Sequence, residues 1–237
     1  MEPGEGQSGT DLRIGLMAAR GPGLRIAASG LMVALLVVAV GAFPRGVADV
    51  YAYFVQAHLD TWAERRHLPK EQEWQRAREL VRAALGWTPE DPRLLQQAGG
   101  LYEWGALIAP RAESRGAQAL QYYRDSLARR PAWPYAWADL AVAKARFGQI
   151  DAEFQQAFAR ALETGPWEPE VQLNIARAGF LAFKRLSRAN RAALARTIQR
   201  MSSRQLPELV RIAEESDSLW IVCTLRGDQP VVQRACT

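Results

Sequence analysis

The chain has 237 residues, of which 49% are hydrophobic and 23% are charged, and its formal net charge is +5. This length suits one or two domains of ordinary size, and the small excess of basic residues does not by itself indicate nucleic-acid binding. Two histidines, His58 and His67, are present, and we find no nucleophile elbow, phosphate-binding glycine loop or zinc-protease motif. We therefore expect no enzyme, no cofactor and no metal site.

An uncharged run from Ile26 to Phe43 follows a leader that is rich in Gly, Ser and Pro. Eighteen residues in a helix extend roughly 27 Å, nearly the thickness of a bilayer's hydrocarbon core. We predict a disordered cytoplasmic leader over residues 1–24 and a single transmembrane helix over residues 25–44. No later segment is long or apolar enough to cross a membrane again.

Arginine placement predicts which side of the membrane holds the remainder of the chain. Arg13, Arg20 and Arg25 precede the apolar run, whereas Arg45 alone follows it closely. Because basic residues stay in the cytoplasm, we expect an inner-membrane protein with a periplasmic C-terminal domain. A cleaved signal peptide ending near Ala42 is the main alternative, and it places the domain in the same compartment. A soluble protein that buries the apolar helix is a third interpretation.

Residues 45–224 carry a divergent repeat. Ala, Leu, Arg, Gln and Glu dominate, so the domain is predicted to be all-α. Small and aromatic residues precede three prolines at the same spacing of four, three and five. The three sets are Ala77, Val81, Ala84 and Pro89; Ala119, Tyr123, Ser126 and Pro131; and Phe154, Phe158, Ala161 and Pro166. This spacing is typical of the second half of a tetratricopeptide (TPR) motif.

The first half of the motif follows two of these prolines. Leu95, Ala98, Gly99 and Tyr102 follow Pro89, and Trp137, Leu140 and Ala141 follow Pro131. We predict a right-handed α-solenoid of three to four degenerate TPR-like hairpins, in which Trp137 lies in the core. The prolines are 42 and 35 residues apart, against about 34 in the family. We assign the excess of eight to a loop extension at residues 110–117.

Both ends of the repeat array are predicted to be atypical, as terminal repeats are. An aromatic-rich helix over residues 47–66 should pair with a helix over residues 70–85. A further hairpin is expected from residues 170–183 and 191–202, and a final helix over residues 207–224 should complete the stack. Residues 225–237 form the predicted tail. We expect a disulfide between Cys223 and Cys236 to close it, because both lie in a domain predicted to be exported.

Two surfaces are candidates for interaction. Trp133 and Tyr135 lie in the turn before Trp137, where exposed aromatic rings suit protein contacts or sugar stacking. The second surface is basic: residues 171–206 hold eight Lys and Arg residues and no acid. Arg196, Arg200 and Arg204 recur every four residues, so a helix through all three would carry them on one face. Packing and solvation are the simpler interpretations of both features.

The layout resembles the membrane-anchored TPR proteins of bacterial exopolysaccharide operons, especially the VpsP type. The resemblance rests on the single N-terminal span, the divergent repeats, the turn from Pro131 to Trp137, and Trp220 to Cys223 followed by Cys236. It implies a non-catalytic scaffold that supports polysaccharide synthesis or export through protein partners. There are two alternatives. One is a periplasmic glycan-binding module whose ligand is an anionic polysaccharide, and the other is an anchored chaperone of the cytochrome-maturation kind. Nucleic acid is not an expected partner.

Overall fold

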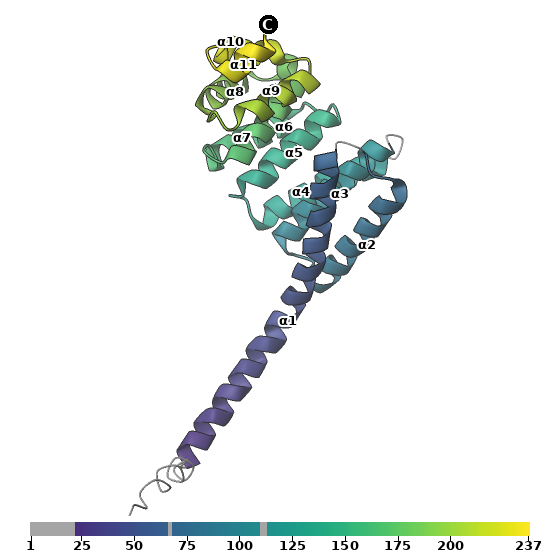
Figure 1. Ribbon diagram of the computed structural model, residues 1–237. Coiled ribbons are helices and arrows are strands. Elements are labelled where there is room, and N and C mark those ends of the chain that lie inside the picture. Colours follow the sequence, from purple (N-terminus) through teal and green to yellow (C-terminus); the bar gives the residue numbers. More distant parts are fainter. Residues whose placement is uncertain (1–21, 66–67, 110–112) are drawn as a thin grey trace, which may run out of the picture. The chain divides into compact units, whose positions relative to one another are not determined.

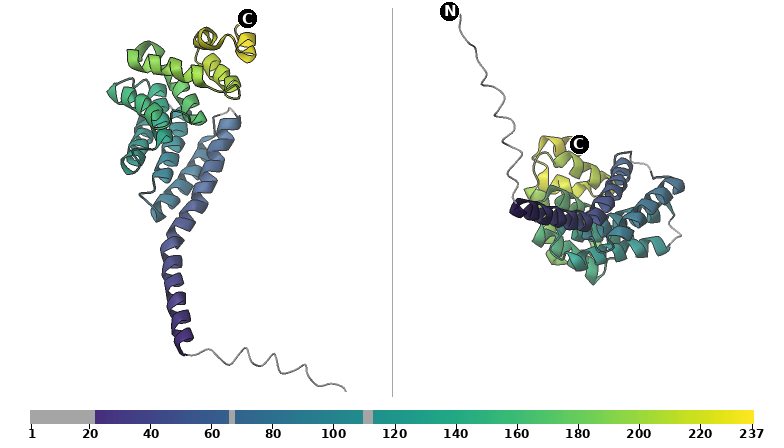
Figure 2. Two further views of the ribbon diagram at one scale, coloured as in Figure 1. Left: turned by 90° about the vertical axis from the view of Figure 1, so that its left-hand side faces the viewer. Right: turned by 90° about the horizontal axis from the view of Figure 1, so that it is seen from below.

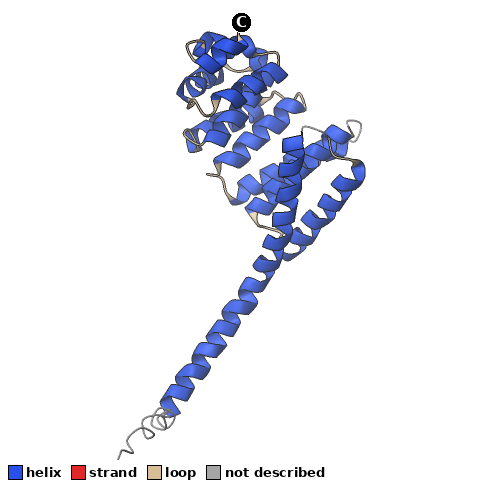
Figure 3. Cartoon of the chain, in the orientation of Figure 1, coloured by secondary structure: helices blue, strands red, loops and turns tan. Residues whose placement is uncertain are grey.

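The computed structural model describes residues 22–65, 68–109 and 113–237. These residues form α-helices, one 3-10 turn and connecting loops, and they contain no strand, as Figure 3 shows. The chain divides into an N-terminal unit that ends at Gly46 and a body, Val47–Thr237. The all-α prediction is therefore confirmed.

The N-terminal unit is formed by the first part of helix α1 (Pro22–Arg65). Its apolar segment has a mean hydropathy of 2.5, and the side chains of that segment are not buried against the protein. The helix is thus long and apolar enough to span a membrane, although a signal sequence would satisfy the same criteria. The leader predicted over residues 1–24 lies mostly outside the described residues, and residues 22–24 belong to α1. The helix also continues through Pro44, where we expected a boundary.

The body is a stack of helical hairpins (Figures 1 and 2). Helix α3 pairs with α4, α5 with α6, and α7 with α8, while α5 also packs on α7, and α7 on α9. The second helix α6 likewise packs on α8. The bounds are α2 (Glu71–Trp87), α3 (Pro92–Ile108), α4 (Glu113–Arg129), α5 (Pro134–Arg146), α6 (Ala152–Thr164), α7 (Pro169–Leu181), η1 (Phe183–Arg185), α8 (Arg188–Arg200), α9 (Leu206–Glu215), α10 (Leu219–Arg226) and α11 (Pro230–Ala235). First helices packing on first helices, and second on second, make a helical solenoid.

The residues of the repeat motif make this packing possible. Gly99 of α3 lies directly against the ring of Tyr123 in α4, and a Cβ at Gly99 would come within 2.6 Å of that ring. A Cβ at Gly105 would likewise lie 2.5 Å from the ring of Trp74. In both places a small residue is required because an aromatic ring fills the space between two helices. The helix expected over residues 47–66, the second part of α1, contacts α2 through side chains: Trp62 shares a buried cluster with Trp74, and Ala52 shares one with Ala84.

Capping side chains and first-turn prolines mark the N-termini of several helices. The carboxylate of Asp91 accepts hydrogen bonds from the backbone N–H groups of Arg93 and Leu94 at the start of α3. Asp151 and Ser187 cap α6 and α8 in the same way. Helices α3, α5 and α7 each have a proline in their first turn, where the missing N–H costs no helical hydrogen bond.

The interval from Pro89 to Pro131 is eight residues longer than a TPR motif, and longer helices account for the difference. Helices α3 and α4 have 17 residues each, whereas α5 and α6 have 13 each. The excess that we assigned to a loop at residues 110–117 therefore adds one turn to each helix. Residues 110–112 lie outside the described part, and α4 already begins at Glu113. A one-turn extension of both helices keeps the hairpin in register, because a turn is about four residues.

The predicted final helix over residues 207–224 is wrong in one respect. The chain forms two helices there, α9 and α10, separated at Asp217, whose φ is +52°. A positive φ takes the backbone out of the right-handed helical region and so ends α9. The predicted tail contains a third short helix, α11, whose Val232 is buried in the core. The expected disulfide is confirmed: Cys223 of α10 is bonded to Cys236, with their Cα atoms 6.0 Å apart.

Candidate interaction groove

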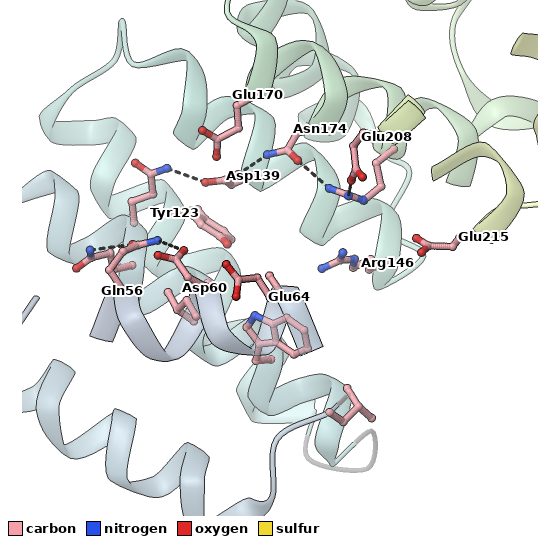
Figure 4. Close-up of a pocket in the computed structure, with 18 of the residues that line it drawn as sticks. Gln56, Asp60, Glu64, Tyr123, Asp139, Arg146, Glu170, Asn174, Glu208 and Glu215 are labelled. Atoms are coloured by element: carbon pink, nitrogen blue, oxygen red, sulfur yellow. Dashed lines mark hydrogen bonds and ion pairs between the residues drawn. The ribbon is translucent and has the colours of Figure 1, made fainter. Parts of the chain in front are cut away.

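A groove of about 910 Å³ runs along the body, and the first helices of the hairpins line it (Figure 4). Helices α1, α3, α5, α7 and α9 all contribute, so the groove crosses the stack rather than lying within one hairpin. Most of its lining is polar or charged. The polar and charged residues that line it include Gln56, Asp60, Glu64, Arg93, Gln96, Gln97, Tyr123, Asp139, Arg146, Glu170, Asn174, Arg177, Glu208, Arg211 and Glu215.

Asp139 of α5 lies at the middle of the groove and links three helices. Its Oδ2 accepts a hydrogen bond of 2.7 Å from Gln96 Nε2 of α3, and its Oδ1 accepts one of 3.1 Å from Asn174 Nδ2 of α7. Burial raises the pKa of Asp139 to about 7; the hydrogen bond from Gln96 opposes the shift and the charges of Glu103 and Glu170 add to it. A carboxyl held by neutral amides alone can thus change its charge near neutral pH.

A buried carboxylate contacts two of the residues that line the groove, Tyr123 and Arg146. Glu103 of α3 accepts hydrogen bonds from the Tyr123 hydroxyl, at 3.0 Å, and from the Arg146 guanidinium. Burial raises the pKa of Tyr123 well above its usual value, and the charge of Glu103 adds to the shift. Tyr123 therefore stays a neutral donor. Because Glu103 is neutralised by Arg146, this pair fixes α3 against α5.

Toward the C-terminus, arginines and carboxylates pair with each other. Arg177 donates to Asn174 Oδ1 at 2.8 Å and lies 3.7 Å from Glu208. Arg211 forms ion pairs with both Glu208 and Glu215 on its own helix, α9. The cationic groups at this end of the groove are consequently already occupied by acids of the protein.

Toward the N-terminus, the carboxylates have neutral partners or none among the described residues. Gln97 donates to Gln56 at 3.0 Å, and Gln56 donates to Asp60 at 2.8 Å. Burial raises the pKa of Glu170 on α7, and the charge of Asp60 on α1 adds to the shift. Figure 4 shows Asp60 and Glu64 side by side on α1, with Glu170 of α7 across the groove from them.

The aromatic candidates are not the free surface that we expected. Trp133 is half-buried; its Nε1 donates to Gln96 at 2.8 Å, and Arg130 lies 3.6 Å from its ring. The Tyr135 hydroxyl donates to Glu168 at 2.6 Å, and this bond raises the pKa of Tyr135 to about 12. Trp137 is half-buried too, with its Nε1 donating to the Pro131 carbonyl at 2.8 Å. The predicted contrast between an exposed Trp133 and a core Trp137 is thus wrong.

The basic candidates do not form one helical face. Arg196 and Arg200 are exposed on α8, but α8 ends at Arg200 and Met201 already has an extended backbone, with ψ of 138°. Arg204 lies in the turn that follows, where the Gln205 side chain accepts from Ser202 and fixes the new direction. Arg200 packs over Trp167, with its guanidinium carbon 5.0 Å from the ring centroid.

Sequence reasoning missed the groove, although a signal was present. Each of the three repeats has a polar residue five positions after the proline that begins its first helix. These residues are Gln97 after Pro92, Asp139 after Pro134 and Asn174 after Pro169. Equivalent positions in successive repeats point to the same face, so polar residues recurring there indicate a continuous polar lining. In the described part of the chain, no group of three or more His, Cys, Asp and Glu residues is arranged to hold a metal ion.

Neither a protein family nor a curated protein matches the chain. A comparison with solved structures finds one from work titled "Functional Characterization of Pseudomonas Aeruginosa pilF". It matches 81% of this chain and 97% of its own, with 14% sequence identity and a TM-score of 0.25. At this level of similarity the match carries no argument about function, and the interpretation rests on the chain's own residues.

Proposed function

We propose that this protein is a non-catalytic, membrane-anchored helical-repeat scaffold that binds a segment of a partner protein in its groove. The observation that carries the proposal is the lining itself. Five first helices supply polar side chains to one channel, and the central carboxylate, Asp139, is shared between three of them. A channel that crosses several repeats suits an elongated ligand, since each repeat can contact a successive part of it.

The proposed location is the periplasmic face of a bacterial inner membrane. The apolar part of α1 would remain in the bilayer, and the arginines before it favour a cytoplasmic N-terminus. The Cys223–Cys236 bond supports this assignment, because disulfides persist in oxidising compartments. The resemblance to exopolysaccharide-operon TPR proteins supports a partner from a polysaccharide assembly complex.

Site-specific photo-crosslinking tests the scaffold. A photoreactive amino acid replaces Gln97 in the groove of the full-length, membrane-bound protein, and the control carries it at Gln121, an exposed glutamine of α4 outside the groove. We expect a discrete adduct from position 97 and none of that size from position 121. Equal adducts from both positions, or none from either in cells that make polysaccharide, would contradict the proposal.

Direct binding of an anionic polysaccharide is the second candidate, and one observation favours it. Arg196 and Arg200 are exposed on α8 without an ion pair among the described residues, and Trp167 beside Arg200 is 71% exposed. An exposed indole next to cations can stack on a sugar ring while the cations contact acidic groups. This surface replaces Trp133 and Tyr135, whose polar groups are engaged within the protein.

A further inference from the structure

Acid and base are distributed unevenly between the groove and the remainder of the chain. The whole chain has a net charge of +5, but the groove is lined by six carboxylates and four arginines. The carboxylates are Asp60, Glu64, Asp139, Glu170, Glu208 and Glu215, and the arginines are Arg93, Arg146, Arg177 and Arg211. The groove therefore has a net negative charge in a protein whose overall charge is positive.

The excess negative charge is concentrated at one end. Glu208 and Glu215 are neutralised by Arg177 and Arg211. The other two arginines pair with acids outside the lining, Arg146 with Glu103 and Arg93 with Asp49. Asp60 and Asp139, by contrast, accept hydrogen bonds from uncharged amides. The pKa values of Asp139 and Glu170 are both raised, first by burial and then in part by neighbouring carboxylates, so these charges repel one another in the empty groove.

Gln97, beside these carboxylates, has a hydrogen-bond acceptor without a partner. The side chain of Gln97 lines the groove, and its Oε1 is fully enclosed and accepts no hydrogen bond. A buried acceptor without a partner costs free energy comparable to a lost hydrogen bond. This deficit is independent of the carboxylates, because Gln97 is uncharged. A ligand that brings N–H groups would satisfy this oxygen if the Gln97 side chain turned toward the groove.

We infer that the end of the groove formed by Asp60, Glu64, Asp139 and Glu170, with Gln97 beside them, receives a Lys or Arg side chain of a basic segment of the partner protein. This inference rests on the proposed function, since it specifies the chemistry of the ligand in the same groove. Ammonium and guanidinium groups supply several donors and a positive charge at once. The groove extends from this end past α7 to α9, so a peptide segment fills it better than a small free amine.

Peptide binding to the full-length protein, held in nanodiscs of uncharged phosphatidylcholine, tests the inference. The probes are three labelled twelve-residue peptides with alternating Ser, in which the other positions are Lys, Gln or Glu. The groove variant combines Asp60→Asn, Glu64→Gln and Glu170→Gln. The control combines Asp228→Asn, Glu79→Gln and Glu163→Gln, which are exposed acids outside the groove. Both variants change the net charge equally.

The Lys peptide should bind best to the wild type and lose affinity by about tenfold in the groove variant, because several charge contacts are lost together. The control should bind the Lys peptide as the wild type does. An equal loss in the control would show attraction by overall charge only and overturn the inference. So would stronger binding of the Glu peptide, or binding of spermine with the same affinity and the same dependence on the three acids.

The crosslink at position 97 separates this inference from the proposed function. If the groove variant keeps its partner adduct at full yield, the scaffold stands and the cation site is overturned. If the protein that carries the photoreactive residue at position 97 and no other change gives no adduct, the proposed function itself fails. Loss of the adduct in the groove variant, with an unchanged adduct in the control variant, supports both.

Discussion

Asp139 and Gln96 are joined by a hydrogen bond of 2.7 Å between side chains of adjacent first helices, at the middle of the groove. Gln96 also accepts a hydrogen bond from Trp133, so one amide connects the groove to the aromatic turn before α5. The turn is therefore better understood as a support for the groove than as a separate binding surface. A change at Trp133 should consequently alter the position of Gln96 and, through it, Asp139.

The titration of Asp139 gives the first prediction. Its pKa is raised in the folded protein to about 7, so the folded state holds the proton more tightly than the unfolded state does. Its contribution is most favourable below its unfolded pKa and is lost as the pH rises from about 4 to about 7. Asp139→Asn removes this loss. Relative to the wild type, the variant should gain about 2–3 kcal/mol of unfolding free energy between pH 5 and pH 8.

Thermal unfolding of the full-length protein in detergent, followed at several pH values, measures this difference. Glu163→Gln, an exposed change outside the groove, serves as the control and should show a difference that stays constant with pH. A constant difference for Asp139→Asn as well would mean that Asp139 remains ionised throughout the range, as an ordinary surface carboxylate does.

Glycine packing gives the second prediction. Gly105→Ala should destabilise the protein by about 1–3 kcal/mol, because the new Cβ would lie 2.5 Å from the buried Trp74 ring. Gly86→Ala in the last turn of α2 meets no atom within 4 Å and should stabilise by about 0.5–1 kcal/mol through helix propensity. Denaturant unfolding compares the two. A neutral or stabilising effect of Gly105→Ala would contradict the close approach of α2 and α3 at Trp74.

The two tryptophans of the turn give the third prediction. Trp133→Ala and Trp137→Ala should each cost about 2–3 kcal/mol, since both rings are half-buried and each indole N–H donates a hydrogen bond. Tyr102→Ala should cost more, about 3–5 kcal/mol, because Tyr102 is buried with its ring edge-on to Trp74. Chemical denaturation of the three variants measures the order. A negligible effect of Trp133→Ala on stability would indicate that Trp133 is exposed, as expected from the sequence.

The repeat motif predicted helix pairing well because it encodes packing. The small residues Ala98 and Gly99 had to face an aromatic ring, and the structure places Tyr123 there. The motif could not predict the lengths of α3 and α4, since an added turn in each helix leaves the motif unchanged. Nor could it reveal the end of α8 at Arg200, because the four-residue spacing of Arg196, Arg200 and Arg204 carries no information about where the backbone turns.

The groove was harder to predict for a different reason. Its residues are polar, and polar residues on a helix are ordinarily solvated, so nothing in one repeat marks Asp139 as special. Only the comparison of Gln97, Asp139 and Asn174 at equivalent positions reveals the lining. Asp60 and Glu170 line the same groove from segments 110 residues apart in sequence, and no local pattern records that relation.

The disulfide gives the fourth prediction. Cys223→Ser combined with Cys236→Ser should lower stability by about 2–3 kcal/mol, as expected from opening a loop of this size in the chain-entropy model. The loss should be concentrated at α10 and α11, because Val232 of α11 is buried beside α9. Hydrogen exchange of the oxidised protein and the double variant locates the change. Thiol labelling of two free cysteines in protein exported without reductant would contradict the bond.

The exposed cations of α8 give the last prediction, and it separates the two proposed functions. Reversal of Arg188, Arg196 and Arg200 to Glu should preserve the fold, because exposed charges contribute little to stability. If the surface binds an anionic polysaccharide, the isolated polymer should bind the wild type with an affinity that falls steeply with salt, and should not bind the variant. Reversal of Arg76, Arg82 and Arg129, which are exposed on α2 and α4, is the matched control.

A protein partner in the groove predicts a different pattern for the same α8 variant. The groove crosslink at position 97 should persist at full yield, since no α8 residue lines the groove. The isolated polymer should then fail to bind even the wild type at low salt. Loss of the crosslink together with loss of polymer binding, and retention of both in the α2 and α4 control, would instead mean that polymer and partner depend on a single surface centred on α8.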